Sequence, residues 1–157
     1  MVDVGEKAPD FLPARSGGGR EVCLSRFLGK WVVLYFYPRD NTLGCTREAK
    51  DFSERLGEFE RLGAVVLGVS KDSVENHRRF RERRGLRVTL LSDPEHRVIE
   101  AYGAWGRKKS HGREYYGTVR STFIIDPEGV VRRVWRNVKV RGHVDEVLEA
   151  LKVLVGE

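Results

Sequence analysis

Cys45 combines a reactive side-chain type with neighbours that would activate it. Before it, the apolar run at residues 31–36 is long enough for a buried strand and too short for a helix. After it, apolar residues at positions 49, 52, 56 and 59 recur at helical spacing, and Thr42 stands where a helix N-cap belongs. The pattern predicts a strand, a loop and a helix, with Cys45 in the first helical turn. Unpaired backbone N–H groups and the helix dipole favour an anion there, and a thiolate is a nucleophile.

The alternative for Cys45 is the commoner role of a free cysteine, that of a small buried hydrophobe. Gly44 before it and the polar residues 46–48 after it are not typical of a core segment. Together with the expected helix start, these neighbours favour a nucleophile.

The residues around Cys45 also resemble a known motif. The spacing Pro38-x-x-x-Thr42-x-x-Cys45 is similar to the active-site signature of the peroxiredoxins, and the run YFYPRDNTLGCTREAKDF resembles their bacterioferritin-comigratory, or peroxiredoxin Q, branch. Further blocks follow in the family's order: APDF, YGAWGRKKSHGREYYG, RSTFIID and RGHVDEVLEAL. The resemblance covers nearly the whole chain. It implies a thioredoxin-like fold and a thiol-dependent peroxidase acting on hydrogen peroxide and organic hydroperoxides.

The resemblance also implies roles for individual residues. Thr42 would offer a hydroxyl that accepts a hydrogen bond from the peroxide and donates one to the sulfur. Arg120 would bring a permanent cation to the thiolate and the peroxide. Pro38 would cover the pocket and exclude water, and the backbone N–H groups of Gly44 and Cys45 would complete the cradle.

Each of these residues has a simpler explanation as well. Thr42 could be only a helix cap, Arg120 only a surface ion-pair partner, and Pro38 only the end of a strand. Their order and spacing together favour the catalytic roles. Glu48, on the same helical face as Cys45, orients the arginine in the family, but it could equally be an acidic residue that favours a helix N-terminus.

Position 50 departs from the family. Many members carry a resolving cysteine five residues after the peroxidatic one, and this chain has Lys50 there. Lysine forms no disulfide, so a sulfenic acid on Cys45 would need another thiol before it is over-oxidised. We therefore expect a one-cysteine-like cycle, with a thioredoxin, a glutaredoxin-like protein or a small thiol as the reductant.

Cys23 is the second of the two cysteines. The alternation in residues 22–24 favours a cysteine packed in a short strand. The alternative is an atypical two-cysteine peroxidase in which Cys23 resolves Cys45, within the chain or between chains. A disulfide needs Cα atoms within about 7 Å, so this route would require a local rearrangement.

The histidines and glycines of the chain predict no cofactor site. His77, His96, His111 and His143 have no metal-ligand spacing with the cysteines, and the sequence has no C-x-x-C motif. A phosphate-binding glycine loop and a dinucleotide fingerprint are also missing from it. We expect a reaction that needs no metal, haem, flavin or nicotinamide from this chain.

Length and composition predict one domain, residues 1–157. With 40% hydrophobic and 33% charged residues, a chain of this length can bury a core and has no signature of disorder. No apolar run approaches the roughly 20 residues that span a bilayer. The start MVDVGEKAPDF lacks the basic and apolar segments of a signal peptide, so we expect a cytoplasmic protein.

The net charge of +6 raises an alternative of another class, a nucleic-acid- or protein-binding module on a thioredoxin-like scaffold. The basic clusters are short, however, and Glu75 and Glu82 interrupt those of one expected helix. A solvated face is the simpler explanation. We therefore expect no nucleic-acid partner, and either a monomer or a weak homodimer.

The remaining segments predict a thioredoxin-like α/β fold: an N-terminal β-hairpin extension at residues 16–24 and a central mixed sheet flanked by helices. Apolar runs predict strands at residues 31–36, 64–69, 88–91, 119–125 and 130–135. Caps and stop signals predict helices from Thr42 to Gly63, from a capping box at Asp72 to Gly85, from Ser92 to Tyr102, and at residues 143–155. Residues 103–117 show no clear period and are expected to form a surface loop.

Overall fold

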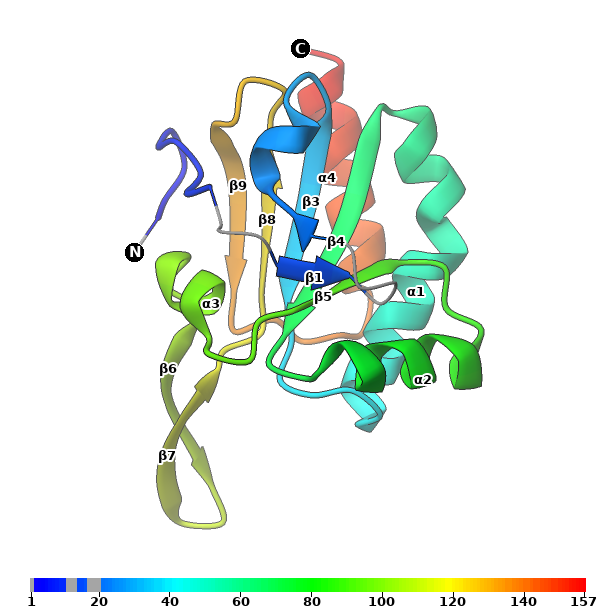
Figure 1. Ribbon diagram of the computed structural model, residues 1–157. Helices are drawn as coiled ribbons and strands as arrows, with labels where there is room; N and C mark the ends of the chain where they lie inside the picture. Colours follow the sequence, from blue (N-terminus) through cyan, green and yellow to red (C-terminus); the bar gives the residue numbers. More distant parts are fainter. Residues whose placement is uncertain (1, 11–13, 17–20) are drawn as a thin grey trace.

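A mixed β-sheet forms the centre of the structure, a computed structural model that describes residues 2–10, 14–16 and 21–157 (Figure 1). The strand order is β2-β1-β5-β4-β3-β8-β9. The strands span, in chain order, Ala14–Ser16 (β1), Glu21–Val22 (β2), Trp31–Phe36 (β3), Ala64–Ser70 (β4), Thr89–Ser92 (β5), Ser121–Ile125 (β8) and Val131–Arg136 (β9). β3, β4 and β5 are parallel, whereas β1 pairs antiparallel with β5, β8 with β3, and β9 with β8. The predicted α/β fold with a central mixed sheet is confirmed.

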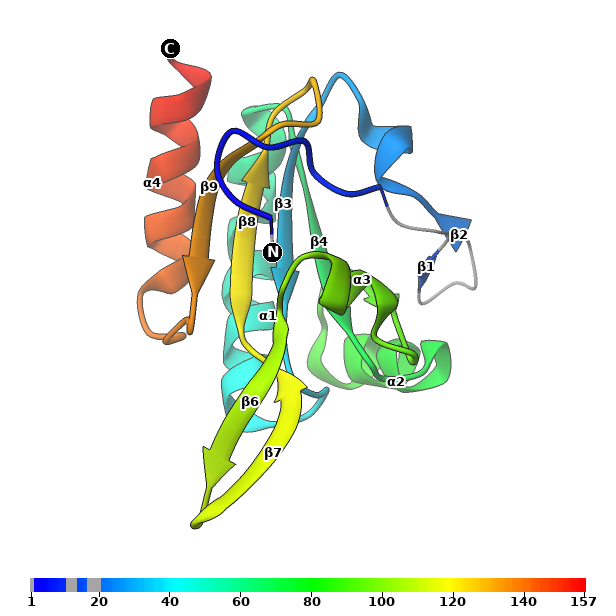
Figure 2. The same cartoon turned by 90° about the vertical axis from the view of Figure 1, so that its left-hand side faces the viewer.

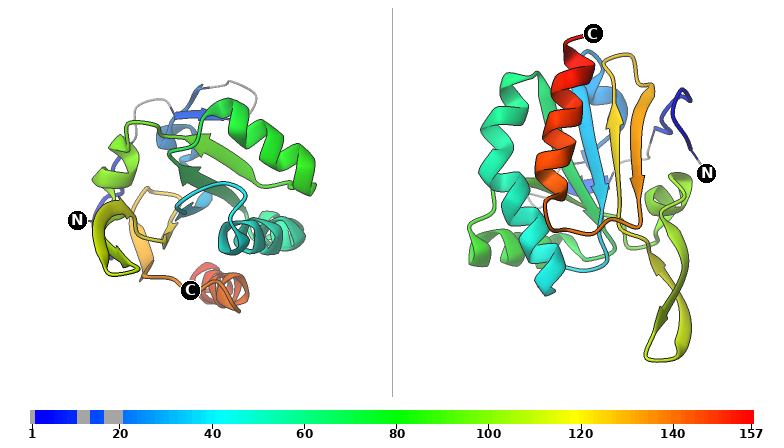
Figure 3. Two further views of the ribbon diagram at one scale, coloured as in Figure 1. Left: turned by 90° about the horizontal axis from the view of Figure 1, so that it is seen from below. Right: turned by 180° about the vertical axis from the view of Figure 1, so that it is seen from behind.

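Helices cover both faces of this sheet. They span Leu43–Arg61 (α1), Val74–Arg84 (α2), Arg97–Ala101 (α3) and His143–Val155 (α4), and a short 3-10 helix, η1, spans Leu24–Phe27. α1 and α4 lie side by side over one face, and α3 packs against the other (Figure 3). Within the described parts of the chain, no helix is long and apolar enough to cross a membrane.

β3 lies in the middle of the sheet, between β4 and β8. Val33 and Tyr35 belong to the hydrophobic cluster under α1 and α4, whereas Val32, Leu34 and Phe36 belong to the cluster under α3. Because both faces are covered, the strand is apolar at successive positions and does not alternate with polar residues. The loop that follows β3 therefore starts from a fully buried element.

The segment expected as a surface loop forms a second sheet of two strands. β6 (Trp105–Ser110) and β7 (Arg113–Thr118) pair antiparallel and project from the body of the molecule (Figure 2). His111 and Gly112 both have positive φ angles, 52° and 77°, as a tight two-residue hairpin turn requires. The prediction of a loop was wrong because most of the hairpin is solvent-exposed on both faces, so its sequence shows no alternation of apolar and polar residues.

The start of α2 also differs from its sequence signal. Ser73, and not Asp72, is the N-cap, and its Oγ accepts a hydrogen bond from the backbone N–H of Asn76 (3.1 Å). The predicted capping box was wrong because the carboxylate of Asp72 is engaged elsewhere, where it accepts a hydrogen bond from Ser70 Oγ. The predicted stop is correct: Gly85 ends the helix with a left-handed φ of 64°.

α3 is shorter than its sequence signal indicates. It begins at Arg97 and not near Ser92, and Tyr102 is its C-cap, as expected. The carboxylate of Asp93 accepts hydrogen bonds from the backbone N–H groups of Arg97 and Ile99 (3.0 and 2.9 Å). Asp93 therefore caps the helix from the turn before it, and the helix begins only after that turn.

The N-terminal hairpin joins the main sheet. β1 and β2 pair antiparallel, as predicted, and β1 also pairs with β5 at the sheet edge. Residues 17–20, which include most of the expected glycine turn, lie outside the described residues. Cys23 follows β2 at the N-cap position of η1, and its carbonyl accepts from the N–H of Arg26 (3.2 Å). Its predicted place within a packed strand was wrong, because the chain turns into η1 there and leaves Cys23 half-buried.

Candidate active site

Cys45 lies beyond the carboxyl end of the central strand β3. A loop at residues 37–42 connects β3 to α1, and Cys45 is the third residue of that helix. Thr42 is the N-cap residue, with extended backbone angles (φ −74°, ψ 155°). Cys45 is only 1% exposed. The structure thus places the thiol at a helix N-terminus, as the sequence predicts, and shields it from bulk solvent.

Arg120 reaches Cys45 because of the pairing between β3 and β8. Phe36, the last residue of β3, lies opposite Ser121, the first residue of β8, so the segment before β8 lies beside the loop after β3. Arg120 Nη2 donates to Cys45 Sγ (3.4 Å), and Arg120 Nη1 donates to Glu48 Oε1 (2.6 Å). One guanidinium therefore joins the thiol and a carboxylate that lies one helical turn farther along α1.

Glu48 is fully buried beside this guanidinium. Burial raises the pKa of Glu48 to about 7, although the Arg120 cation acts in the opposite direction. For Arg120, burial opposes the charge, but the carboxylate and the sulfur beside it outweigh burial and raise its pKa. Among the described residues, Glu48 Oε2 has no hydrogen-bond partner. The contact is the one expected of a carboxylate that orients the arginine.

The raised pKa of Glu48 predicts how stability depends on pH. The ordinary pKa is 4.5, so between pH 4.5 and about 7 the folded state holds a proton that the unfolded chain has released. Rising pH should therefore lower the free energy of unfolding in this window. Relative to Glu48→Gln, which cannot titrate, the wild type should lose about 3 kcal/mol.

Urea unfolding of both proteins at pH 4.5, 6 and 8 measures this difference. Glu60→Gln, which removes an exposed carboxylate from the same helix, is the matched control and should follow the wild type. If Glu48→Gln shows the same pH dependence as the wild type, the buried carboxylate does not titrate as expected.

Gly44 makes room for the guanidinium. A Cβ atom at this position would lie 3.2 Å from Arg120 Nη2, which is tighter than an ordinary contact. The family resemblance implied only a backbone role for Gly44. Its steric role comes from the approach of Arg120, which is distant in the sequence.

Tyr35 lies near the site, and the sequence did not single it out. Its ring lies over Gly68, where a Cβ would come within 2.6 Å of Tyr35 Cζ, and it stacks on Phe52 with 4.5 Å between the ring centroids. Burial, and then the negative charges of Glu48 and Cys45, raise the pKa of Tyr35 well above its usual value. Tyr35 therefore stays neutral, and it belongs to the same hydrophobic cluster as Cys45.

Thr42 and Pro38 lie in the loop before Cys45, and both are half-buried. Thr42 Oγ1 donates to the backbone carbonyl of Arg39 (3.1 Å), so its lone pairs remain available to accept from a peroxide. In this structure the hydroxyl of Thr42 donates its hydrogen bond to the backbone carbonyl of Arg39 and not to Cys45 Sγ. The expected donation from Thr42 to Cys45 would need the hydroxyl to rotate.

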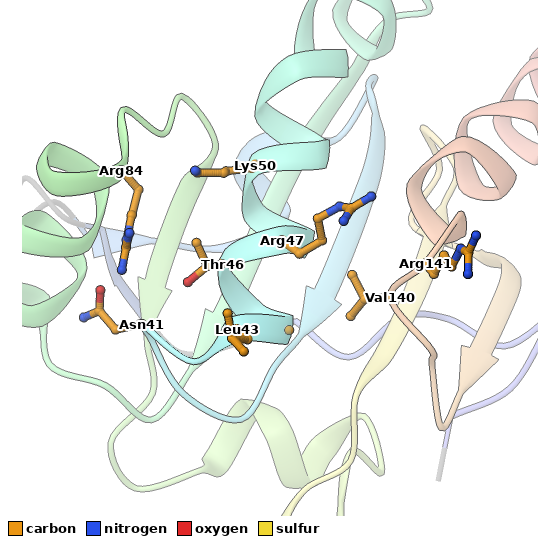
Figure 4. Close-up of a pocket in the computed structure, with 9 residues that line it drawn as sticks. Asn41, Leu43, Thr46, Arg47, Lys50, Arg84, Val140 and Arg141 are labelled. Carbon is orange, nitrogen blue, oxygen red and sulfur yellow. The ribbon is translucent and has the colours of Figure 1, made fainter.

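A groove with a volume of about 790 Å³ flanks the start of α1 (Figure 4). Its lining residues are Asn41, Leu43, Gly44, Thr46, Arg47, Lys50, Arg84, Val140 and Arg141. Four of these described residues are cationic and none is acidic. Figure 4 shows Lys50 and Arg84 on one side of the helix, with Val140 and Arg141 on the other. The groove presents a positive surface next to the buried thiol.

In the basic cluster on α2, Arg78 and Arg79 are paired with acidic neighbours. Arg78 forms ion pairs with Glu75 and Glu82, and Arg79 pairs with Glu75. The side chains of these two arginines and two glutamates are 49% to 68% exposed. These pairs support the interpretation of this cluster as a solvated helix face.

Sequence comparison identifies the family to which this site belongs. A sequence model of the AhpC/TSA family matches residues 4–134, a range that contains Thr42, Cys45, Glu48 and Arg120. The chain belongs to the AhpC/TSA family. Its relatives in this family are named peroxiredoxins, and peroxiredoxins are thiol-dependent peroxidases.

Named relatives narrow the branch of the AhpC/TSA family. Peroxiredoxin Bcp of Bacillus subtilis is 49% identical over 151 residues and covers 96% of both chains. A putative peroxiredoxin bcp of Helicobacter pylori is 47% identical over 150 residues, 96% of this chain and 98% of the relative. A structure of the Xanthomonas campestris bacterioferritin comigratory protein, described for its alkyl peroxide reduction activity, has a TM-score of 0.88 at 43% identity over 92% of each chain. The resemblance to the bacterioferritin-comigratory, or peroxiredoxin Q, branch is confirmed.

Proposed function

We propose that Cys45 reduces hydrogen peroxide and organic hydroperoxides in a one-cysteine cycle. The observation that carries this proposal is the hydrogen bond from Arg120 to Cys45 Sγ in the first turn of α1, with Glu48 holding the same guanidinium. The thiolate of Cys45 attacks one oxygen of ROOH, the S–O bond forms as the O–O bond breaks, and RO⁻ takes up a proton to leave as ROH. The sulfur becomes a sulfenic acid.

The surrounding groups lower the barrier to this step by position and charge. Arg120 stabilises the thiolate and the negative charge that moves onto the leaving oxygen. Thr42 accepts a hydrogen bond from the peroxide and aligns it for attack. Pro38 limits the access of water to Cys45 Sγ, and the backbone N–H groups of Gly44 and Cys45 face the oxygen atoms of the peroxide.

Reduction of the sulfenic acid then depends on a second molecule. Lys50 occupies the position of the nearby resolving cysteine, so an external thiol attacks Cys45, forms a mixed disulfide and releases water. A second thiol reduces the mixed disulfide, and both electrons come from the two thiols. A thioredoxin-type protein is the expected reductant, as for other peroxiredoxins, and the positive groove beside α1 would favour an acidic partner.

The position of Cys23 argues against an internal disulfide. It follows β2, at the far edge of the sheet, and four strand spacings separate β2 from β3, the strand before Cys45. At about 4.8 Å each, these spacings amount to about 19 Å, compared with the 7 Å that a disulfide allows. A two-cysteine cycle within one chain would therefore require a large rearrangement, and pairing between chains would still require Cys45, which is 1% exposed, to become accessible.

Product analysis after a single oxidation tests the one-cysteine cycle. Reduced protein receives one equivalent of hydrogen peroxide in the presence of dimedone, which traps sulfenic acids, and is analysed by mass spectrometry and non-reducing electrophoresis. We expect a dimedone adduct on Cys45 in the wild type and an equal yield in Cys23→Ser. A disulfide between Cys23 and Cys45, within or between chains, would instead support the two-cysteine alternative.

A further inference from the structure

Asp40 anchors the loop that carries the active site to a buried network outside that site. It lies two residues before Thr42 and five before Cys45. Both of its carboxylate oxygens are engaged: Oδ1 accepts from the hydroxyl of Tyr37 (2.6 Å), and Oδ2 lies 2.7 Å from His77 Nδ1 on α2. His77 is fully buried.

Both ring nitrogens of His77 face a hydrogen-bond partner. Nε2 faces the backbone carbonyl of Leu91 on β5 (3.1 Å), which can only accept, so Nε2 carries a hydrogen. The short contact between Nδ1 and Asp40 Oδ2 needs a second hydrogen between the two atoms. Loss of either partner would therefore leave a buried polar group without its hydrogen bond.

The backbone of the loop is held as well. The N–H of Asp40 donates to Asp72 Oδ2 (2.8 Å), which also accepts from Ser70 Oγ at the end of β4 (2.8 Å). Asn41, the next residue, has a left-handed φ of 66°, so the chain turns sharply between Asp40 and Thr42. Both the side chain and the backbone N–H of Asp40 are therefore held just before the chain turns into α1.

Cys45 must meet two opposite demands if the proposed function holds. Attack on a peroxide requires Thr42, Cys45 and Arg120 in their folded arrangement. Reduction by an external thiol requires access to a sulfur that is almost completely buried, so the first turn of α1 has to open. Whatever anchors the loop before this turn therefore affects the two half-reactions in opposite directions.

We infer that the Asp40–His77 pair is a latch that holds the first turn of α1 closed and so sets the balance between oxidation of Cys45 and its reduction. Neither side chain contacts the sulfur, and both act by positioning the loop at residues 37–42. With the latch weakened, the open conformation is more populated. Oxidation by peroxide then slows, while the sulfur becomes more accessible to thiols and alkylating reagents.

The test compares two substitutions of His77 in a Cys23→Ser parent, so that Cys45 is the one thiol that reacts. His77→Gln can keep the hydrogen bond to the Leu91 carbonyl but loses the hydrogen bond to Asp40. His77→Asn keeps a donor that faces Asp40. For His77→Gln we expect about tenfold slower oxidation by peroxide in stopped flow, and about tenfold faster alkylation of reduced Cys45 by iodoacetamide and reduction of the sulfenic acid by dithiothreitol. His77→Asn should restore all three rates toward the parent.

Two further variants separate the latch from a general loss of stability. Leu151→Ala creates a cavity under α4 and should lower the urea midpoint without changing any of the three rates. Tyr37→Phe removes one donor to Asp40 and should give the same opposite shifts at smaller size, even if His77→Gln does not fold. Three results would each overturn the latch. The first is that the rates are unchanged in whichever of His77→Gln and Tyr37→Phe folds. The others are that oxidation and alkylation shift in the same direction, or that Leu151→Ala gives the same opposite shifts.

The alkylation rate keeps this inference distinct from the peroxidase proposal. If the parent fails to react with peroxide, the proposed function is wrong, yet alkylation of Cys45 still reports whether the first turn opens more often in the variants. If the parent reacts and alkylation does not change in the folded variants, the latch is wrong and the peroxidase proposal is unaffected.

Discussion

Replacing Cys45 with serine is expected to abolish peroxide reduction, with a rate loss of at least about 10³-fold. A serine hydroxyl is not ionised near neutral pH and has no partner base at this position, so it cannot replace a thiolate as the nucleophile. The Arg120 guanidinium donates a hydrogen bond to this sulfur, which is the observation behind the proposed role of Cys45. Stopped-flow tryptophan fluorescence of the reduced protein mixed with hydrogen peroxide measures the reaction directly.

Cys23→Ser is the matched control for this substitution, because it removes the other thiol of the chain. We expect its oxidation rate to equal that of the wild type, since Cys23 lies at the far edge of the sheet. A second kinetic phase that is lost in Cys23→Ser would show that Cys23 takes part in resolution. A Cys45→Ser protein that still consumes peroxide would refute the assignment of the nucleophile.

Replacing Arg120 with glutamine should slow the reaction with peroxide by about 10²-fold, the usual effect of removing a group that stabilises developing charge. The substitution removes the cation beside Cys45 and leaves the buried carboxylate of Glu48 without its partner. Arg120→Lys keeps the charge but not the fork of donors that reaches both atoms, so an intermediate loss is expected. Rates from stopped flow, with folding checked by urea unfolding, measure both effects.

A double substitution tests whether Glu48 acts through Arg120. If it does, Glu48→Gln should lower the rate in the wild type and have little further effect in Arg120→Gln. Arg132→Gln, which removes an arginine paired with Glu157 on the surface, should leave the rate unchanged. Independent, additive losses from Glu48 and Arg120 would contradict the positioning role of Glu48.

The sequence predicts the unit around Cys45 well because its signals are local. The apolar run of β3, the cap position of Thr42 and the helical spacing of α1 all lie within thirty or so residues, and each rests on short-range physics. The location of Arg120 does not follow from such signals. It depends on the pairing of β3 with β8, which brings Arg120 to Cys45 across 75 positions of sequence, so its role could be stated only through the family resemblance.

Other features escape prediction for different physical reasons. An acidic residue in the first turns of a helix is normally solvated, so nothing in the sequence indicates that Glu48 is fully buried. The contact between Asp40 and His77 joins a loop to a helix 37 residues away, with no pattern at either end. The β6–β7 hairpin lacks apolar alternation, although the His111-Gly112 turn was a signal that could have indicated it.

The register between β3 and β8 has a consequence for folding kinetics. Cys45 and Arg120 come from segments far apart in the chain, and they meet only when Phe36 stands opposite Ser121. A shift of one residue would turn the side chains of β8 to the other face of the sheet. Under the proposed function, rapid reaction with peroxide can therefore arise during refolding only once this long-range strand pairing is complete. The time at which Cys45 becomes reactive would then report when β3 and β8 have paired.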